Sequence, residues 1–327
     1  MNSERIEWID EVKGLCMLLI IISHSVSFQG CEFFYSAYIL PFFFVSGFTS
    51  KFPNINLLKR SRRLLIPYFF YSLVYLLIYT IKDRNVWDLV RNCIGVLYAR
   101  SWIFRDVTYF ENIRFDIALW FLPTMFISYV ILKLFKNVGF WSSSIILLFS
   151  SYLLTYLPVL LPWGLDIAPL CAWFILLGFN FKRFMGGHVP FLYVILSLSF
   201  YVFLVWINGS INLSISKFGQ NFCASYFVCI LINLLFTAIL VVIFRQYSGK
   251  LLFKKILLYF GTHSLRLYCL NLFGIIVANI LVPQFKIQII DVNNILRLFV
   301  VLISIYVADR FLNSFSAKSN FVIFKYI

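Results

Sequence analysis

Residues 9–25 read IDEVKGLCMLLIIISHS, an apolar run with a charged beginning and a single histidine near its end. At about 100° per residue, the steps from Lys13 to His24 come to three turns plus about 20°. A helix would therefore place both side chains on one face, about 16 Å apart along its axis. Titratable side chains are costly inside a bilayer and commonly mark a working site. A lone histidine is also common as an interhelical hydrogen-bond partner, so both interpretations of His24 stay open.

The composition places the chain in a membrane. Of its 327 residues, 62% are hydrophobic and 13% are charged, whereas a soluble domain carries about 25% charged residues. We therefore expect an all-α, polytopic membrane bundle of about ten transmembrane helices, forming a single domain over residues 1–327. The predicted spans are 10–29, 33–49, 64–81, 118–135, 142–161, 167–181, 189–207, 222–244, 263–282 and 295–315.

The net charge of +15 follows the membrane topology and does not indicate nucleic-acid binding. Lys and Arg concentrate in alternate short loops, which predicts that both termini are cytoplasmic. The first span lacks a cleavage site and is expected to be retained. The seven cysteines are scattered, and the spacings typical of metal sites, phosphate loops and dinucleotide folds are absent. We expect no metal and no bound cofactor.

Basic residues near the first and third spans are candidates for binding an anion. Asp10 lies three residues before Lys13, within reach of a helical ion pair; the two could also serve only as an anchor at the helix end. The run KRSRR at 59–63 is denser in cations than topology requires. Its arginines suit bidentate phosphate binding, although a purely topological role is the alternative. The candidates in this run are Arg60, Arg62 and Arg63.

The segment 82–117 is predicted to be the one sizeable hydrophilic loop on the outer side. It mixes aromatic rings with charged residues, among them Asp116. Such a mixture suits a carbohydrate, but it is equally typical of an amphipathic element lying on the membrane. Trp120, next to Pro123, is either an ordinary span entry or a wall of the site. His263 and Arg266 near the inner face are interpreted as polar groups at a helix end, with a contact to the donor as the alternative.

Five stretches together resemble the membrane acyltransferase 3 family, in particular its fucose O-acetylase-like branch. The first is IDEVKG at 9–14 followed by His24, which is similar to the branch's pattern of a basic residue, ten residues and a histidine. Many members of the family have Arg in place of Lys13, and the family often has His where this chain has Asn271. The other stretches are PFFFVSGF at 41–48, RRLLIPY at 62–68, LWFL at 119–122 and GTHSLRLY at 261–268.

The resemblance implies an O-acetyltransferase that moves an acetyl group from acetyl-coenzyme A to a hydroxyl of a surface polysaccharide, such as O-antigen, capsule or exopolysaccharide. It implies a multi-pass protein of the bacterial inner membrane whose acceptor is a lipid-linked or nascent glycan. Neutral His24 would act as general base, or else carry the acetyl group itself. Lys13, Asp10 and the arginine cluster would bind the donor. Ser46, Asp116 and Trp120 are the candidates for the oxyanion or acceptor site.

A transporter or flippase of a lipid-linked saccharide is the competing interpretation, because Arg266 and Arg297 lie within predicted spans and would suit an anionic lipid. Against it, the chain shows no repeated pair of broken helices. A non-catalytic membrane scaffold is a third possibility, but a scaffold would not explain why Lys13 and His24 lie on one face of the first span.

Overall fold

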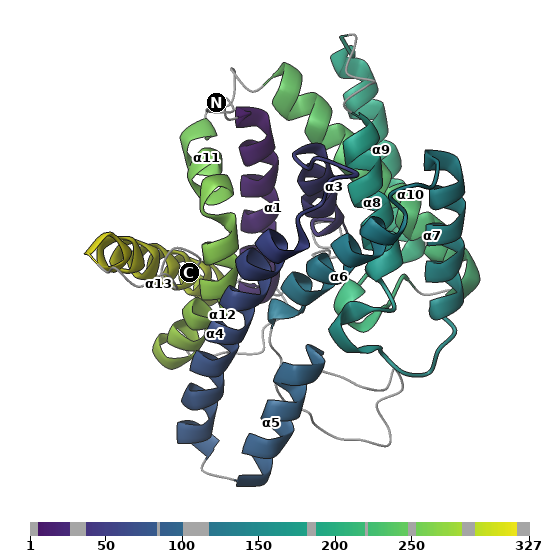
Figure 1. Cartoon of the computed structure of the whole chain (residues 1–327). Helices are drawn as coiled ribbons and strands as arrows, with labels where there is room; N and C mark the ends of the chain where they lie inside the picture. The colour runs from purple at the N-terminus through teal and green to yellow at the C-terminus, as the bar shows by residue number, and fades with distance from the viewer. Residues whose placement is uncertain are drawn as a thin grey trace. The chain divides into compact units, whose positions relative to one another are not determined.

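Long apolar runs of the sequence form the main helices of this chain. The computed structural model describes residues 6–26, 37–83, 86–100, 118–181, 188–219, 222–247, 253–282 and 292–318, and within them it has twelve α-helices and no β-strand (Figure 1). The helices are α1 (Glu7–Ser25), α3 (Leu40–Phe48), α4 (Leu57–Asp83), α5 (Val86–Tyr98), α6 (Phe121–Leu134), α7 (Phe140–Leu154), α8 (Ala168–Phe181), α9 (Phe191–Asn208), α10 (Phe222–Gln246), α11 (Lys254–Thr262), α12 (Ser264–Leu281) and α13 (Val292–Lys318). Three short 3₁₀ helices, η1 (Ala118–Trp120), η2 (Pro162–Gly164) and η4 (Leu213–Ile215), lie in the connections.

The all-helical prediction is confirmed for the described residues, and each predicted span overlaps one α-helix. Within those residues, five stretches are long and apolar enough to cross a membrane, and α6 and α7 are shorter apolar helices. The number of ten spans and the cytoplasmic position of both termini remain predictions. The five stretches are Leu57–Thr80, Pro162–Phe181, Phe191–Asn208, Ala224–Gln246 and Ser264–Leu281.

Two helices lie outside the ten predicted spans. Helix α5 occupies part of the segment 82–117, and it exposes an apolar stripe made of Val90, Ile94 and Leu97. This is the amphipathic element that was one of the two interpretations of that segment. Helix α11 lies in the basic stretch before α12. Helix α11 was not expected, because a short helix with charges lacks a continuous apolar run.

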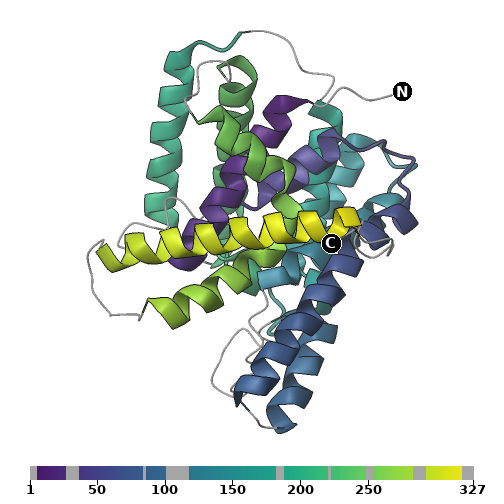
Figure 2. The same cartoon turned by 90° about the vertical axis from the view of Figure 1, so that its left-hand side faces the viewer.

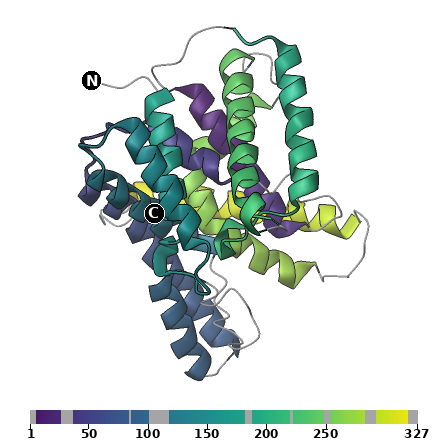
Figure 3. The ribbon, with the colours of Figure 1, turned by 90° about the vertical axis from the view of Figure 1, so that its right-hand side faces the viewer.

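The described chain divides into two compact units. In the first, α1 packs against α10, α11, α12 and α13, and α9 packs against α10. Figure 2 shows α12 and α13 running together. In the second unit, α4 packs against α5 and α6, and α8 packs against α6 and α7; Figure 3 shows α4 and α5 side by side.

Exposure of apolar side chains shows which helices need a lipid environment. Helix α8 is largely buried inside its unit, whereas α9 is also strongly apolar and largely exposed. A helix that is apolar on all sides and uncovered by protein is stable only against lipid. The large exposed side chains of α9 include Phe191, Leu192, Leu196, Phe200, Phe203 and Trp206.

Candidate functional site

Helix α1 carries both ends of the predicted site in the first unit. It is continuous from Glu7 to Ser25, so the steps between Lys13 and His24 amount to a rise of about 16 Å. The Lys13 ammonium lies 3.5 Å from the Asp10 carboxylate, which confirms the predicted ion pair. Lys13 is partly buried and His24 is exposed. The helix therefore presents a paired cation near its beginning and an accessible imidazole in its last turn.

The imidazole of His24 is held by the residue before it. The Ser23 hydroxyl oxygen lies 2.8 Å from Nδ1 of His24 and 2.7 Å from the carbonyl oxygen of Ile20. The Tyr38 hydroxyl oxygen lies 3.3 Å from the same Ser23 oxygen. On the other side of His24, the Ser25 hydroxyl donates to the carbonyl oxygen of Ile21 at 2.6 Å. His24 thus has one hydroxyl neighbour that contacts its ring and one whose hydrogen bond is directed at the backbone.

The acidic beginning of α1 is neutralised by α11. The Lys254 ammonium lies 2.7 Å from Glu7 and 3.7 Å from the fully buried Glu11. The hydrogen bond with Glu7 raises the pKa of Lys254, so the ammonium stays charged at neutral pH. The contact gives the buried Glu11 carboxylate a cation nearby, which a charge inside an apolar bundle needs.

Two glycines allow α1 and α11 to pack backbone against backbone. A Cβ atom on Gly14 would lie 2.0 Å from the carbonyl oxygen of Leu257, and one on Gly261 would lie 1.7 Å from that of Asp10. Neither position has room for a methyl group. The stretches 9–14 and 261–268, far apart in the sequence, are therefore packed against each other (Figure 1).

His263 lies at the junction between α11 and α12 and has a structural environment. Its Nδ1 is 2.9 Å from the Thr262 hydroxyl and 3.0 Å from the carbonyl oxygen of Tyr259, and its ring centroid is 4.7 Å from that of Tyr259. The Tyr259 hydroxyl donates to the buried Asp309 at 2.7 Å, and Arg266 pairs with the same carboxylate at 2.8 Å. This agrees with the interpretation of His263 and Arg266 as polar groups at a helix end.

In the second unit, Arg60 and Ser46 converge on one tyrosine. The Arg60 guanidinium lies 4.1 Å from the ring centroid of Tyr129, and the Ser46 hydroxyl is 2.5 Å from the hydroxyl of Tyr129. Arg62 and Arg63 lie on the same first turns of α4 and are exposed. The predicted arginine cluster therefore has one member stacked on an aromatic ring and two that are open to solutes.

Gly47 explains how Ser46 is placed against α6 and α8. A Cβ atom on Gly47 would lie 1.9 Å from the carbonyl oxygen of Ile175 in α8. The backbone of α3 is thus in close contact with α8 at the residue after Ser46. The Tyr129 hydroxyl holds the Ser46 hydroxyl in place and donates to the carbonyl oxygen of the same residue at 3.2 Å.

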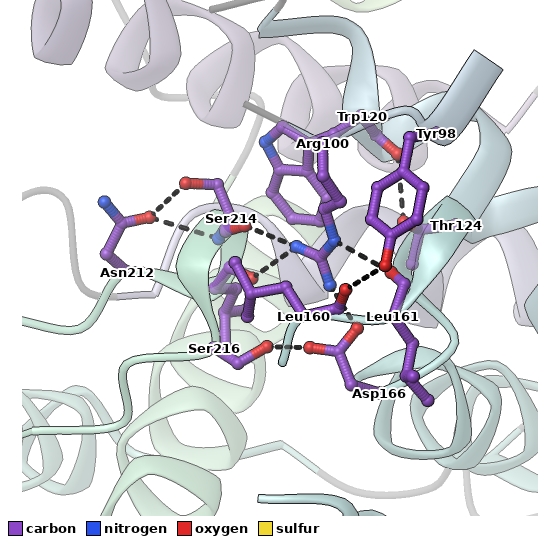
Figure 4. A network of polar contacts seen from close by, with 11 residues as sticks. Tyr98, Arg100, Trp120, Thr124, Leu160, Leu161, Asp166, Asn212, Ser214 and Ser216 are labelled. Atoms are coloured by element: carbon purple, nitrogen blue, oxygen red, sulfur yellow. Dashed lines mark hydrogen bonds and ion pairs between the residues drawn. The ribbon is translucent and has the colours of Figure 1, made fainter. Parts of the chain in front are cut away.

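Trp120 belongs to a buried polar network of the second unit (Figure 4). The Arg100 guanidinium lies 5.7 Å from its ring centroid and pairs with Asp166 at 2.5 Å, both side chains being fully buried. Arg100 also donates to the carbonyl oxygens of Leu161, Leu213 and Ser214, and Ser216 donates to Asp166.

This network fastens three connections to one another, because Arg100 follows α5, Asp166 follows η2 and Ser216 follows η4. A carbonyl or carboxylate oxygen accepts each of these hydrogen bonds from Arg100. A buried guanidinium needs such acceptors, because burial removes its hydrogen bonds to water. Arg100 therefore holds the loops and is not available to a substrate. Asp116, the remaining site candidate, lies outside the described residues.

The comparisons with known proteins identify the kind of domain. A family model described as an acyltransferase domain matches residues 6–308, nearly the whole chain. The match includes helices of both compact units. No curated protein and no solved structure is similar enough to this chain to count as a match.

Proposed function

Because the chain belongs to the acyltransferase 3 family, we propose that it is a membrane O-acetyltransferase of surface polysaccharides. In this proposal the donor is acetyl-coenzyme A from the cytoplasm, and the acceptor is a sugar hydroxyl of a lipid-linked or nascent glycan. The protein then acts as a multi-pass enzyme of the bacterial inner membrane. The observation that carries the proposal is the family match together with a single helix, α1, that bears both Lys13 and an accessible His24.

The proposed chemistry uses His24 as the general base. The imidazole accepts the proton of the acceptor hydroxyl while that oxygen attacks the acetyl carbon, and general base catalysis of this kind contributes about 10²- to 10⁴-fold. The thioester C–S bond then breaks, and the coenzyme A thiolate takes the proton back from the imidazolium. In the alternative route, His24 itself carries the acetyl group before the glycan receives it.

The proposed donor contacts are cationic, since coenzyme A is rich in phosphate. Lys13, oriented by Asp10, and the arginines of α4 supply positive charge. Arg62 and Arg63 are exposed, and Arg60 is stacked on Tyr129. Ser46 is proposed for the oxyanion site because Tyr129 holds its hydroxyl in place, and its proton would have to turn from Tyr129 to the oxyanion. Asp116 and Trp120 remain proposed acceptor-side residues.

The test is mass spectrometry of the surface glycan from a strain that lacks the protein and is complemented with variants. We expect His24→Ala to give glycan of normal amount without acetyl groups, and Lys13→Ala to need more acetyl-coenzyme A for the same transfer. His188→Ala is the matched control, because His188 lies beside Tyr247 at the beginning of α9 and has no part in the proposed chemistry. Depletion of the glycan itself would instead support a transporter, and unchanged acetylation in His24→Ala would remove His24 as the base.

The two routes are separable by rapid acid quenching with labelled acetyl-coenzyme A and no acceptor. Label recovered on a peptide that contains His24 supports the acetyl-histidine route. Absence of label, combined with normal transfer once the acceptor is added, supports direct attack.

A further inference from the structure

The hydroxyl of Ser23 has a single proton and three hydrogen-bond neighbours, namely the Ile20 carbonyl oxygen, Nδ1 of His24 and, at 3.3 Å, the Tyr38 hydroxyl. The Ile20 carbonyl oxygen, 2.7 Å away, can only accept a hydrogen bond. It is also the closest of the three neighbours, and the Ser23 proton is assigned to it on that ground. The Ser23 oxygen then has only lone pairs left to offer to Nδ1 of His24, 2.8 Å away.

Hydrogen bonding of one imidazole nitrogen decides which nitrogen carries the proton of neutral histidine. If Nδ1 faces a lone pair, Nδ1 must be the protonated nitrogen. Nε2 of His24 is then the nitrogen with the lone pair. A general base needs that lone pair on the nitrogen that approaches the substrate, because the other tautomer would present an N–H group there.

We propose that Ser23 is a positioning residue that holds His24 in the Nδ1–H tautomer, so that Nε2 receives the proton of the acceptor hydroxyl. The role rests on the proposed acyl transfer, since it assigns Ser23 to the same base. In other enzymes a hydrogen-bond partner at one ring nitrogen fixes the tautomer of the catalytic histidine. Here that partner is a neutral hydroxyl, the proton of which is donated to the backbone.

The neighbouring serine provides a matched control. Ser25 also lies next to His24 and also donates to a backbone carbonyl, that of Ile21 at 2.6 Å. This hydrogen bond is directed at the backbone. Replacing Ser25 therefore removes a helix hydroxyl of the same kind without the contact to Nδ1.

The first experiment is nitrogen-15 NMR of the full-length protein in lipid nanodiscs with labelled histidine. The chain has three histidines, and the loss of one signal in His24→Ala assigns the residue. We expect a protonated Nδ1 and an unprotonated Nε2 for His24 in the unsubstituted protein and in Ser25→Ala, and a shift toward the other tautomer in Ser23→Ala. An Nε2–H tautomer in the unsubstituted protein, or an unchanged tautomer in Ser23→Ala, would overturn the proposal.

The second experiment is acetyl transfer by the same variants. Loss of the partner that orients a metal-bound histidine typically costs about 10- to 100-fold, and we expect kcat of Ser23→Ala to fall by a similar factor with KM for acetyl-coenzyme A unchanged. Ser23→Thr, which keeps the hydroxyl, should restore kcat, and Ser25→Ala should retain it. A changed tautomer with undiminished kcat would overturn the positioning role alone, whereas full transfer by His24→Ala would overturn the proposed base itself.

Discussion

His24 and His263 share one pair of local contacts, but Nδ1 of His263 also lies 3.0 Å from the carbonyl oxygen of Tyr259, and the surroundings of the two rings differ. Each histidine comes directly after a hydroxyl residue, and each hydroxyl donates to the carbonyl oxygen three residues before it, at 2.7 Å for Ser23 and 3.0 Å for Thr262. Each hydroxyl oxygen also faces Nδ1 of the next ring, at 2.8 Å and 2.9 Å respectively. The backbone of a helix end thus produces the same pair twice.

The tertiary contacts around each ring separate the two histidines. The ring of His263 packs on Tyr259, which is bonded to Asp309 and through it to Arg266, at a junction of two helices. His24 lies in the last turn of α1 and is exposed. The side chains around the ring therefore decide whether a hydroxyl–histidine pair stabilises the fold or is accessible for chemistry.

Replacing each histidine in turn tests this distinction most directly. We expect His24→Gln to lower kcat/KM of acetyl transfer by about 10²- to 10⁴-fold, because the base is lost. His263→Gln should keep transfer within a few-fold. Transfer of labelled acetyl groups in proteoliposomes measures both, and equal losses in the two variants would contradict the distinction.

The ion pair beside His263 should show a large effect on stability. Asp309→Ala leaves the Arg266 guanidinium and the Tyr259 hydroxyl without their carboxylate, and loss of one partner of a buried pair costs about 3–5 kcal/mol. Thermal unfolding in detergent should therefore show a markedly lower transition temperature. Glu7→Gln is the control, since Glu7 is 62% exposed and its loss should leave the transition unchanged. A transition temperature of Asp309→Ala equal to that of the control would show that the pair is dispensable.

The contact between α1 and α11 joins the two histidine-bearing segments, and overpacking it should have an intermediate effect. In Gly261→Ala the new methyl group meets the Asp10 carbonyl oxygen at 1.7 Å, and such overpacking costs about 1–3 kcal/mol. Gly139→Ala, where no atom lies within 4 Å, is the control. Yield of monodisperse protein on size exclusion and its transition temperature report the difference, and identical values for the two variants would refute the tight packing.

The smallest expected effect is that of the hydroxyl beside His263. Thr262→Val keeps the shape of the side chain and removes its hydrogen bonds to Tyr259 and His263, which costs about 0.5–1.5 kcal/mol. Acetyl transfer should be unchanged, in contrast with Ser23→Ala. If Thr262→Val lowered kcat as much as Ser23→Ala, the two pairs would not differ in function.

Much of the helical framework could be predicted because long apolar runs leave the chain no other way to satisfy its backbone in lipid. The ion pair of Asp10 with Lys13 was equally predictable, since residues three apart share a helix face. Helix α5 was one of two interpretations of its segment, and α11 was not predicted, because short charged helices depend on the elements against which they pack. Arg100 was assigned to a mixed hydrophilic loop, although it is buried against Asp166.

Some of the missed residues did leave a signal in the sequence. Asp309 is a carboxylate within a predicted apolar span, and such residues usually have a partner or a function; the structure pairs it with Arg266. The ion pair of Glu7 with Lys254 could not be predicted in this way. The two residues are far apart in the sequence, and neither local sequence points to the other. Tyr129 likewise looked like one more aromatic residue of a span until Arg60 and Ser46 were found on it.

The amino-acid sequence alone was enough to establish that this chain is helical and apolar, that it carries a cation and an imidazole three turns apart, and which family's motifs it has. Those properties depend on composition and on spacing along one helix, which the chain carries locally. The folded arrangement was needed to show that Gly14 and Gly261 bring distant stretches into contact, and that one histidine is packed into an ion-pair network while the other is exposed. Packing and burial involve residues far apart in sequence, so the environment of each histidine is fixed only when the helices assemble.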